Sequence, residues 1–288
     1  MKVYAKFTLW FKENLNQEEK IRYEGFVEKM KPYIEYKMKS LNWYRVPITR
    51  PEYEYAHEMA EKYPVQEDEE GERLPGVYIS ESSIIEIDYE KKDYEKAVAY
   101  RLHFWYIAYL YEDEGSDEYT EPCCENPNWD GEVCEIQNRP LIMPAKEVYK
   151  KKYAQLMPGY GVAEEIRSLL LEHGAKQEDF TEIRNKQGKL IFYQVTPQNV
   201  IKGFIEDNDI PIEDECKNCG QKRYGDKKQT EPYYISKSTL EQLTALNRTE
   251  EMYGLELEPW YIVNKETYLL LKEHYKRIQF EPIFLKEN

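Results

Sequence analysis

Pro158-Gly-Tyr-Gly-Val-Ala-Glu-Glu-Ile-Arg-Ser-Leu-Leu-Leu-Glu-His173 recurs at a constant offset as Pro259-Trp-Tyr-Ile-Val-Asn-Lys-Glu-Thr-Tyr-Leu-Leu-Leu-Lys-Glu-His274. The two segments share far more identities than unrelated segments of this length, so we interpret them as an internal duplication. The identical pairs are Pro158/Pro259, Tyr160/Tyr261, Val162/Val263, Glu165/Glu266, Leu169/Leu270, Leu170/Leu271, Glu172/Glu273 and His173/His274.

Each copy is predicted to contain a strand followed by a helix. In the first copy, Ile166, Leu169 and Leu170 form an apolar stripe at helical spacing. In the second, Asn264 precedes the helix and is a predicted N-cap. Each helix is followed by a strand-like stretch that begins with Phe, at residues 180–183 and 280–283. The copies extend over about residues 116–200 and 201–288.

The part of the chain before the duplication mixes strand and helix patterns. Val3 to Phe11 alternates between apolar and polar residues, which is typical of a strand, whereas residues 17–39 have helical spacing interrupted by Pro32. The remaining predicted elements are strands at 41–46, 77–79, 84–87 and 97–111 and a helix at 51–63. The acidic run that starts at Glu112 is the predicted domain boundary.

These patterns predict an α+β protein. A mixed strand/helix domain at residues 1–115 precedes a duplicated α+β unit at 116–288, which carries a zinc-ribbon-like cysteine knuckle. The knuckle is Cys216-Lys217-Asn218-Cys219-Gly220, whose two-residue gap lets both thiolates bind one ion.

A complete zinc site needs two further ligands. We expect Cys124 and Cys134, at the corresponding place in the first copy, to join Cys216 and Cys219 around a structural Zn²⁺. The alternative is that the cysteines are ordinary thiols in loops. A redox-active pair is disfavoured, because the segment after Cys219 has the composition of a turn and not of a helix N-terminus.

The chain is strongly acidic, with a net charge of −15 at pH 7 spread over both of its halves. A field of this sign repels phosphate backbones and anionic lipids, so we expect neither nucleic acid nor a membrane as a partner. The sequence contains no apolar run of membrane-spanning length and no signal-peptide pattern at Met1 to Lys6, which predicts a cytoplasmic protein.

Two acidic runs with nearby tyrosines are candidate partner-binding segments. Acidic side chains raise the association rate with a basic protein, and tyrosines supply anchors. The candidates are Glu67, Asp68, Glu69, Glu70, Glu112, Asp113, Glu114, Tyr109 and Tyr111. The alternative is that both runs are solvated loops.

The sequence lacks a recognisable catalytic set. It has four histidines, of which His173 and His274 occupy equivalent repeat positions beside the core stripe and are predicted to be structural. His103 has no nucleophile near it in the sequence, and phosphate-binding glycine loops, nucleophile elbows and His-Glu-x-x-His motifs are absent. We therefore favour a protein that acts by binding and is not an enzyme.

The C-terminal half resembles the double-CXXCG-motif proteins of bacteria, immunity proteins of polymorphic toxin systems. The likeness extends from about Cys134 to Lys286, and its first knuckle is degenerate. It is carried by Lys150 to Gln155, Glu182 to Arg184, Tyr193 to Pro197, Cys216 to Gly220, Tyr261 to Glu266 and Phe280 to Ile283. The resemblance implies that the protein binds and neutralises a cognate toxin, commonly a basic nuclease. The alternatives are a zinc-ribbon scaffold within a larger assembly and an enzyme that uses carboxylates.

Overall fold

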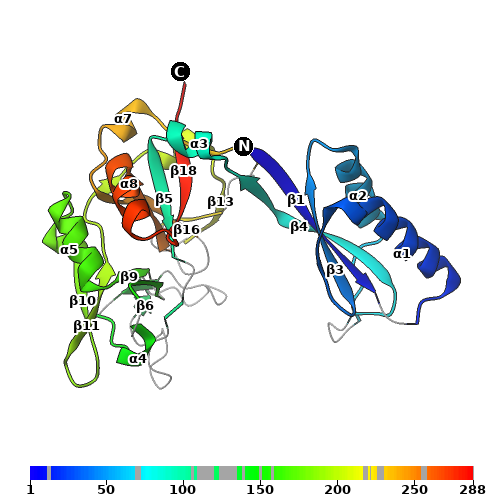
Figure 1. Ribbon diagram of the computed structural model, residues 1–288, viewed down its shortest axis with the longest axis horizontal. Coiled ribbons are helices and arrows are strands. Elements are labelled where there is room, and N and C mark those ends of the chain that lie inside the picture. The colour runs from blue at the N-terminus through cyan, green and yellow to red at the C-terminus, as the bar shows by residue number, and fades with distance from the viewer. Residues whose placement is uncertain are drawn as a thin grey trace. The chain divides into compact units, whose positions relative to one another are not determined.

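The computed structural model describes residues 1–11, 14–68, 73–104, 107–108, 120–122, 135–137, 140–148, 151–156, 159–216, 220, 222–225, 230–253 and 258–287. The chain forms two compact units (Figure 1). The N-terminal unit consists of Met1–Asp93 with Lys228–Glu231, and the C-terminal unit of Tyr94–Lys227 with Pro232–Asn288. The mixture of sheets and helices in both units confirms the α+β class.

The N-terminal unit is a four-stranded antiparallel sheet covered on one face by two helices (Figure 1). The strand order is β2-β3-β1-β4. The elements are β1 (Lys2–Phe11), α1 (Gln17–Met30), the 3₁₀ turn η1 (Lys31–Tyr33), β2 (Ile34–Lys37), β3 (Leu41–Pro47), α2 (Pro51–Lys62) and β4 (Val77–Asp88).

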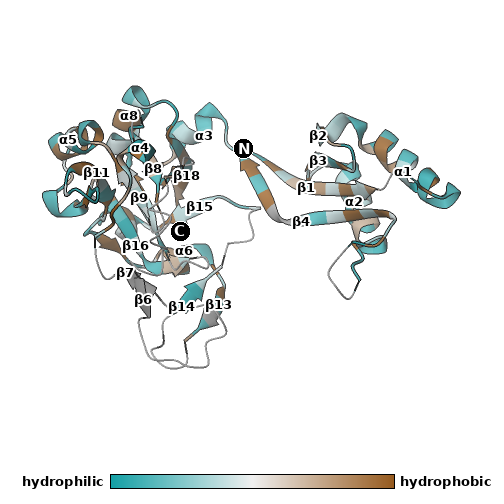
Figure 2. Cartoon of the chain, turned by 90° about the horizontal axis from the view of Figure 1, so that it is seen from below, coloured by the Kyte–Doolittle hydropathy of each residue, from teal (hydrophilic) through white to brown (hydrophobic). Residues whose placement is uncertain are grey.

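Alternation along the strands creates the core of this unit. Ala5, Phe7 and Leu9 of β1 are buried, and the residues between them lie on the other face of the sheet. Figure 2 shows the same alternation of hydrophobic and hydrophilic residues along β1 and β4. Phe26 of α1 packs edge-on against Tyr44 of β3, with ring centroids 5.3 Å apart, so both helices lie on the Phe7 face.

Residues 34–37 were predicted to continue the first helix, and this prediction is wrong. The helix α1 ends at Met30, and Pro32 lies in η1. Proline lacks a backbone N–H, so the chain leaves the helix there and becomes β2, which pairs with β3. The strands predicted at 77–79 and 84–87 are one continuous strand, β4, because both halves pair with β1 across a bulge.

The C-terminal unit contains three sheets. The largest has eight strands in the order β13-β14-β16-β17-β5-β18-β15, with β12 added beside β16; a second has the order β10-β11-β9-β8, and β6 pairs with β7. The strands are β5 (Ala99–His103), β6 (Thr120–Pro122), β7 (Glu135–Gln137), β8 (Tyr153–Gln155), β9 (Tyr160–Val162), β10 (Phe180–Arg184), β11 (Leu190–Val195), β12 (Val200–Ile201), β13 (Ile212–Glu215), β14 (Lys222–Tyr224), β15 (Tyr233–Ile235), β16 (Leu246–Tyr253), β17 (Glu258–Asn264) and β18 (Gln279–Leu285). The helices are α3 (Lys91–Lys96), α4 (Ala145–Val148), α5 (Glu164–Glu172), α6 (Phe204–Asn208), α7 (Lys237–Leu240) and α8 (Lys265–His274), with the 3₁₀ turn η3 (Gln177–Asp179).

The two repeat segments fold alike. Each forms a strand, a helix and a second strand: β9, α5 and β10 in one case, β17, α8 and β18 in the other. In both sheets the two repeat strands flank one antiparallel strand, so the order β8-β9-β11-β10 corresponds to β16-β17-β5-β18. The middle strand differs in origin, because β11 follows β10 in the chain whereas β5 comes from far upstream. Asn264 caps α8 as predicted, its side chain accepting a hydrogen bond from Thr267 N.

The position of β5 determines where the units divide. Tyr100 and Leu102 are buried in the core that the two repeat segments share, and Tyr100 stacks on Tyr268 at a centroid distance of 3.7 Å. Ala99 is buried in a second core cluster of the same unit. The division therefore lies between Asp93 and Tyr94, ahead of the boundary expected at residue 115. Residues 94–104 belong with the C-terminal unit.

Candidate functional site

Of the four predicted zinc ligands, the described residues include Cys216, whose side chain is buried. Cys124, Cys134 and Cys219 lie outside the described residues. Gly220 N donates a hydrogen bond to Cys216 O at 2.7 Å, and Gly220 has a φ of +72°. A left-handed φ is strained for residues with a Cβ, so glycine suits this position. Within the described ranges, His, Cys, Asp and Glu side chains do not gather into a metal-binding group of three or more.

The predicted partner-binding segments fall mostly on residues that are not described. Glu67 and Asp68 are exposed, and Glu67 forms an isolated antiparallel bridge with Arg73. Glu69, Glu70, Glu112, Asp113, Glu114, Tyr109 and Tyr111 lie outside the described residues.

The N-terminal unit exposes a group of large apolar side chains that sequence reasoning missed. Tyr36 is 50% exposed, Met38 51% and Trp43 45%, and all three lie on the hairpin of β2 and β3. Tyr36 is paired with Trp43 across the strands, and their rings are 5.4 Å apart. Because Tyr44 points into the core, its neighbour Trp43 points to the face of the sheet that α1 and α2 leave open. We call Tyr36, Met38 and Trp43 the aromatic hairpin.

Next to the aromatic hairpin, the charged groups of the same sheet face are already paired. Arg45 donates to Glu86 at 3.0 Å and to Asp88 at 2.6 and 3.0 Å, and its guanidinium stacks over Tyr4 at 3.9 Å. The bond to Asp88 raises the pKa of Arg45, and the same bond lowers the pKa of Asp88. Burial would raise the pKa of Glu86, but hydrogen bonds from Lys6 and Arg45 outweigh it and the pKa is lowered, so Arg45, Glu86 and Asp88 all stay charged at neutral pH. The exposed, uncharged part of the face is therefore the aromatic hairpin.

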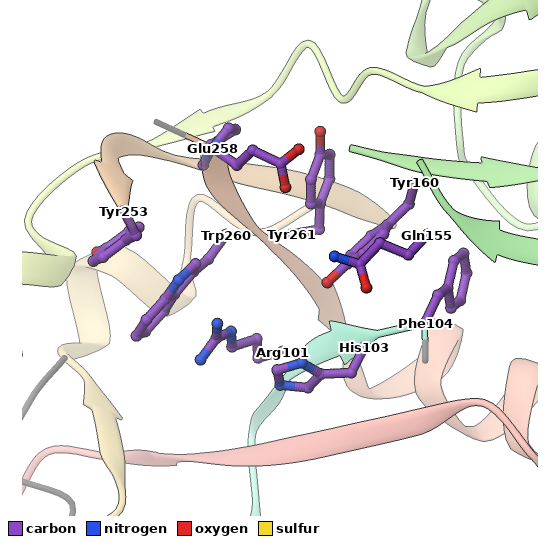
Figure 3. Close-up of a pocket in the computed structure, with 10 residues that line it drawn as sticks. Arg101, His103, Phe104, Gln155, Tyr160, Tyr253, Glu258, Trp260 and Tyr261 are labelled. Atoms are coloured by element: carbon purple, nitrogen blue, oxygen red, sulfur yellow. The ribbon is translucent and has the colours of Figure 1, made fainter. Parts of the chain in front are cut away.

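A cavity of about 270 Å³ opens in the C-terminal unit, between the two repeat segments (Figure 3). The strand β5 contributes Arg101 and His103, and Phe104 follows directly. Gln155 of β8, Tyr160 of β9, Tyr253 of β16 and residues 258–261 of β17 complete the lining. The equivalent tyrosines of the repeat, Tyr160 and Tyr261, meet here with their rings 5.0 Å apart.

Arg101 is the central charge of the cavity. Its guanidinium lies over the Trp260 ring at 3.6 Å, and its Nη1 donates to Glu281 at 3.5 Å. His103 Nε2 is 3.6 Å from the same carboxylate oxygen. Burial lowers the pKa of His103, which leaves the imidazole neutral at pH 7. Burial alone would raise the pKa of Glu281, but the hydrogen bond from His103 and the charge of Arg101 outweigh it, and the pKa is lowered.

The remaining wall of the cavity is aromatic. Tyr253 stacks on Trp260 with ring centroids 4.1 Å apart, so Trp260 is in contact with both Tyr253 and Arg101. The Tyr253 hydroxyl is buried and has no hydrogen-bond partner among the described residues. The Glu258 carboxylate lies beside the Tyr261 ring (Figure 3). It accepts a hydrogen bond from Gly159 N.

The lining residues are suited to binding a ligand. Burial raises the pKa of Tyr160 to about 12 and raises the pKa values of Tyr253 and Tyr261 as well, so these phenols remain protonated donors at neutral pH. The lining contains Arg, His, Glu and Gln beside aromatic rings, with no Ser, Thr, Cys or Lys nucleophile among its described members. His103 was considered from the sequence without a partner, and Glu281 supplies one.

Comparison with protein-family models, with curated proteins and with solved structures finds no match for this chain. None of the helices in the described part of the chain combines the length and the apolar character needed to cross a bilayer.

Proposed function

We propose that the protein is a cytoplasmic immunity protein, which binds a basic toxin domain and neutralises it without catalysing a reaction. The observation that supports this proposal most directly is the aromatic hairpin, Tyr36, Met38 and Trp43, on an open sheet face. Tyr, Trp and Met are enriched in the buried centres of protein interfaces, where a few such anchors supply most of the binding free energy.

Charge supports the nature of the partner. The net charge of −15 attracts a basic protein and speeds its approach over about a Debye length of 10 Å at 0.1 M salt. In the N-terminal unit, α2 exposes Glu54, Glu58 and Glu61 at helical spacing. Glutamates four residues apart repel each other and slightly destabilise the helix. A basic surface bound against this row would relieve that repulsion, which favours a basic partner.

The C-terminal unit is proposed to be a duplicated scaffold. The common strand order of the two repeat segments, each with one antiparallel strand between its repeat strands, supports the duplication inferred from the sequence. We propose that Cys124, Cys134, Cys216 and Cys219 hold a structural Zn²⁺ in this unit; the turn closed by Gly220 and the burial of Cys216 support this. Elemental analysis of the purified protein tests whether zinc is bound. We expect one zinc per chain.

The test of the function is binding to a basic toxin domain taken from the genes that neighbour this protein's gene, measured by titration calorimetry. We expect a 1:1 complex and loss of toxin activity. The double variant Tyr36→Ala/Trp43→Ala should weaken binding by at least about 30-fold, because removing hot-spot residues costs about 2 kcal/mol or more. Ile21→Ala is the matched control, since Ile21 is 65% exposed on α1 in the same unit.

Two results would contradict the proposal. One is a toxin domain that shows no association with the chain at low salt, where charge attraction is strongest. The other is a double variant that binds as tightly as Ile21→Ala, which would remove the aromatic hairpin from the interface.

A further inference from the structure

The cavity beside Arg101 has the size of a small-metabolite site. Its volume of about 270 Å³ corresponds to roughly nine water molecules at about 30 Å³ each. This lies at the lower end of ligand pockets, and the mixture of aromatic walls with a few polar groups is typical of them. The cavity lies within the C-terminal unit, whereas the aromatic hairpin lies in the N-terminal unit.

Arg101 has N–H groups available for a ligand. Within the described residues its one hydrogen bond is the 3.5 Å bond from Nη1 to Glu281. The Arg101 side chain is 21% exposed, so its remaining N–H groups are accessible from the cavity. A carboxylate matches the fork of an arginine with two parallel bonds.

The acidic side chains of the cavity disfavour a ligand that carries only negative charge. Glu258 lines the same cavity, and Glu281 stays ionised beside Arg101, so the three charges sum to a negative site in a chain of net charge −15. A ligand that also carries an ammonium group would pair with Glu258. The rings of Tyr160 and Tyr261, which adjoin Glu258, favour a cation or an apolar group over their faces (Figure 3).

We propose that this cavity binds a small zwitterion, an α-amino acid with an apolar side chain. Arg101 holds its carboxylate, Glu258 holds its ammonium group, and Tyr160, Tyr261 and Phe104 contact its side chain. The site goes beyond the proposed toxin-binding function, and its occupancy is measurable with no toxin present.

The test compares three ligands on the full-length chain: L-phenylalanine, phenethylamine without the carboxylate, and 3-phenylpropionate without the ammonium group. Calorimetry gives the affinities. The chain has five tryptophans, so the contribution of Trp260 is the part of the fluorescence change that is lost in Trp260→Phe, and this part reports contact with the cavity. We expect the amino acid to bind about tenfold to a hundredfold tighter than either analogue, the usual effect of deleting one charged hydrogen-bonding group. L-leucine, which has the same zwitterionic group, should bind as well.

Single-residue variants test which side chain of the cavity binds which group of the ligand. Arg101→Met removes the group that binds the carboxylate, so L-phenylalanine should then bind no tighter than phenethylamine. Glu258→Gln removes the group that binds the ammonium, so L-phenylalanine should then bind no tighter than 3-phenylpropionate. Glu250→Gln, an exposed glutamate of β16 outside the lining, is the matched control. Arg101→Gln also removes the charge and keeps polar N–H groups, so it replaces Arg101→Met should that variant fail to fold.

Three outcomes would overturn the proposal. In the first, none of the ligands binds the folded chain at millimolar concentration. In the second, the acid binds as tightly as the amino acid and Glu258→Gln has no effect, which makes the cavity an anion site. In the third, binding occurs but leaves the fluorescence of Trp260 and the affinity of the Arg101 variants unchanged, which places the ligand elsewhere.

Discussion

At the scale of single residues, glycines show how closely the chain is packed. Gly161 lies in β9, and a Cβ added there would be 2.6 Å from Phe192 and 2.9 Å from Leu156. Phe192 is 1% exposed and belongs to a core cluster, so it cannot move aside at low cost. Gly25, in the middle of α1, has open space where its Cβ would be. At position 161 packing therefore requires glycine, whereas at position 25 glycine only makes the helix less stable.

Alanine at the two positions should change stability in opposite directions. Gly161→Ala overfills a packed site and is expected to lower the free energy of unfolding by about 1–3 kcal/mol. Gly25→Ala removes a flexible residue from an exposed helix interior and should raise it by about 0.5–1 kcal/mol. Urea denaturation of both variants beside the wild type checks the signs. A Gly161→Ala variant as stable as the wild type would mean that β9 is loosely packed.

At the scale of elements, the sequence predicts what depends on local pattern. The strand β1 and the helix α2 were expected from period-two alternation and from Pro51 at a helix start, and both form. The strand β2 was missed, because its apolar residues happen to continue the spacing of α1 and only its pairing with β3 reveals it. The cavity was missed for a similar reason: Arg101 and Trp260 meet through the pairing of β5 with β17, which no local pattern encodes.

The contact between α2 and β4 should make stability depend on pH. His57 Nδ1 is 2.5 Å from Glu81 Oε2, and Glu61 lies 3.6 Å from Nε2. The hydrogen bond to Glu81 raises the pKa of His57 above its ordinary value. The native state then binds the proton more tightly than the unfolded chain, so the contribution to stability is complete below about pH 6.5 and is lost as pH rises through the folded pKa.

The measurement is the urea midpoint from pH 5.5 to 8.5 for the wild type and for His57→Gln. We expect the midpoint of the wild type to decrease relative to that of His57→Gln across this window. The effect should be small, because the His57 side chain is 45% exposed and solvent screens the pair. A difference between the two proteins that is constant with pH would exclude the linkage.

At the scale of the whole molecule, the two units depend differently on the chain around β5. The N-terminal unit has its own sheet and its own core, so residues 1–93 contain most of what this unit needs to fold. The C-terminal unit requires β5, because this strand fills the gap between β17 and β18 and places Tyr100 against Tyr268 and Phe280. The acidic run after residue 111 follows β5 in the chain, and the two compact units divide ahead of β5, between Asp93 and Tyr94.

Two fragments of the chain distinguish a C-terminal unit that begins at residue 94 from one that begins at residue 116. The fragment 94–288 should fold, with dispersed amide resonances and a cooperative thermal transition. The fragment 116–288 should not, because it leaves β17 and β18 without their common partner and removes the buried side chains of Ala99, Tyr100 and Leu102. Truncating one large core side chain such as Leu102 to Ala costs about 2–5 kcal/mol, a large share of the stability of a typical domain of about 5–15 kcal/mol. A synthetic peptide of residues 94–108 added to the shorter fragment should restore the transition. If the fragment 116–288 unfolds as cooperatively as 94–288 does, β5 is dispensable and the unit ends where the acidic run begins.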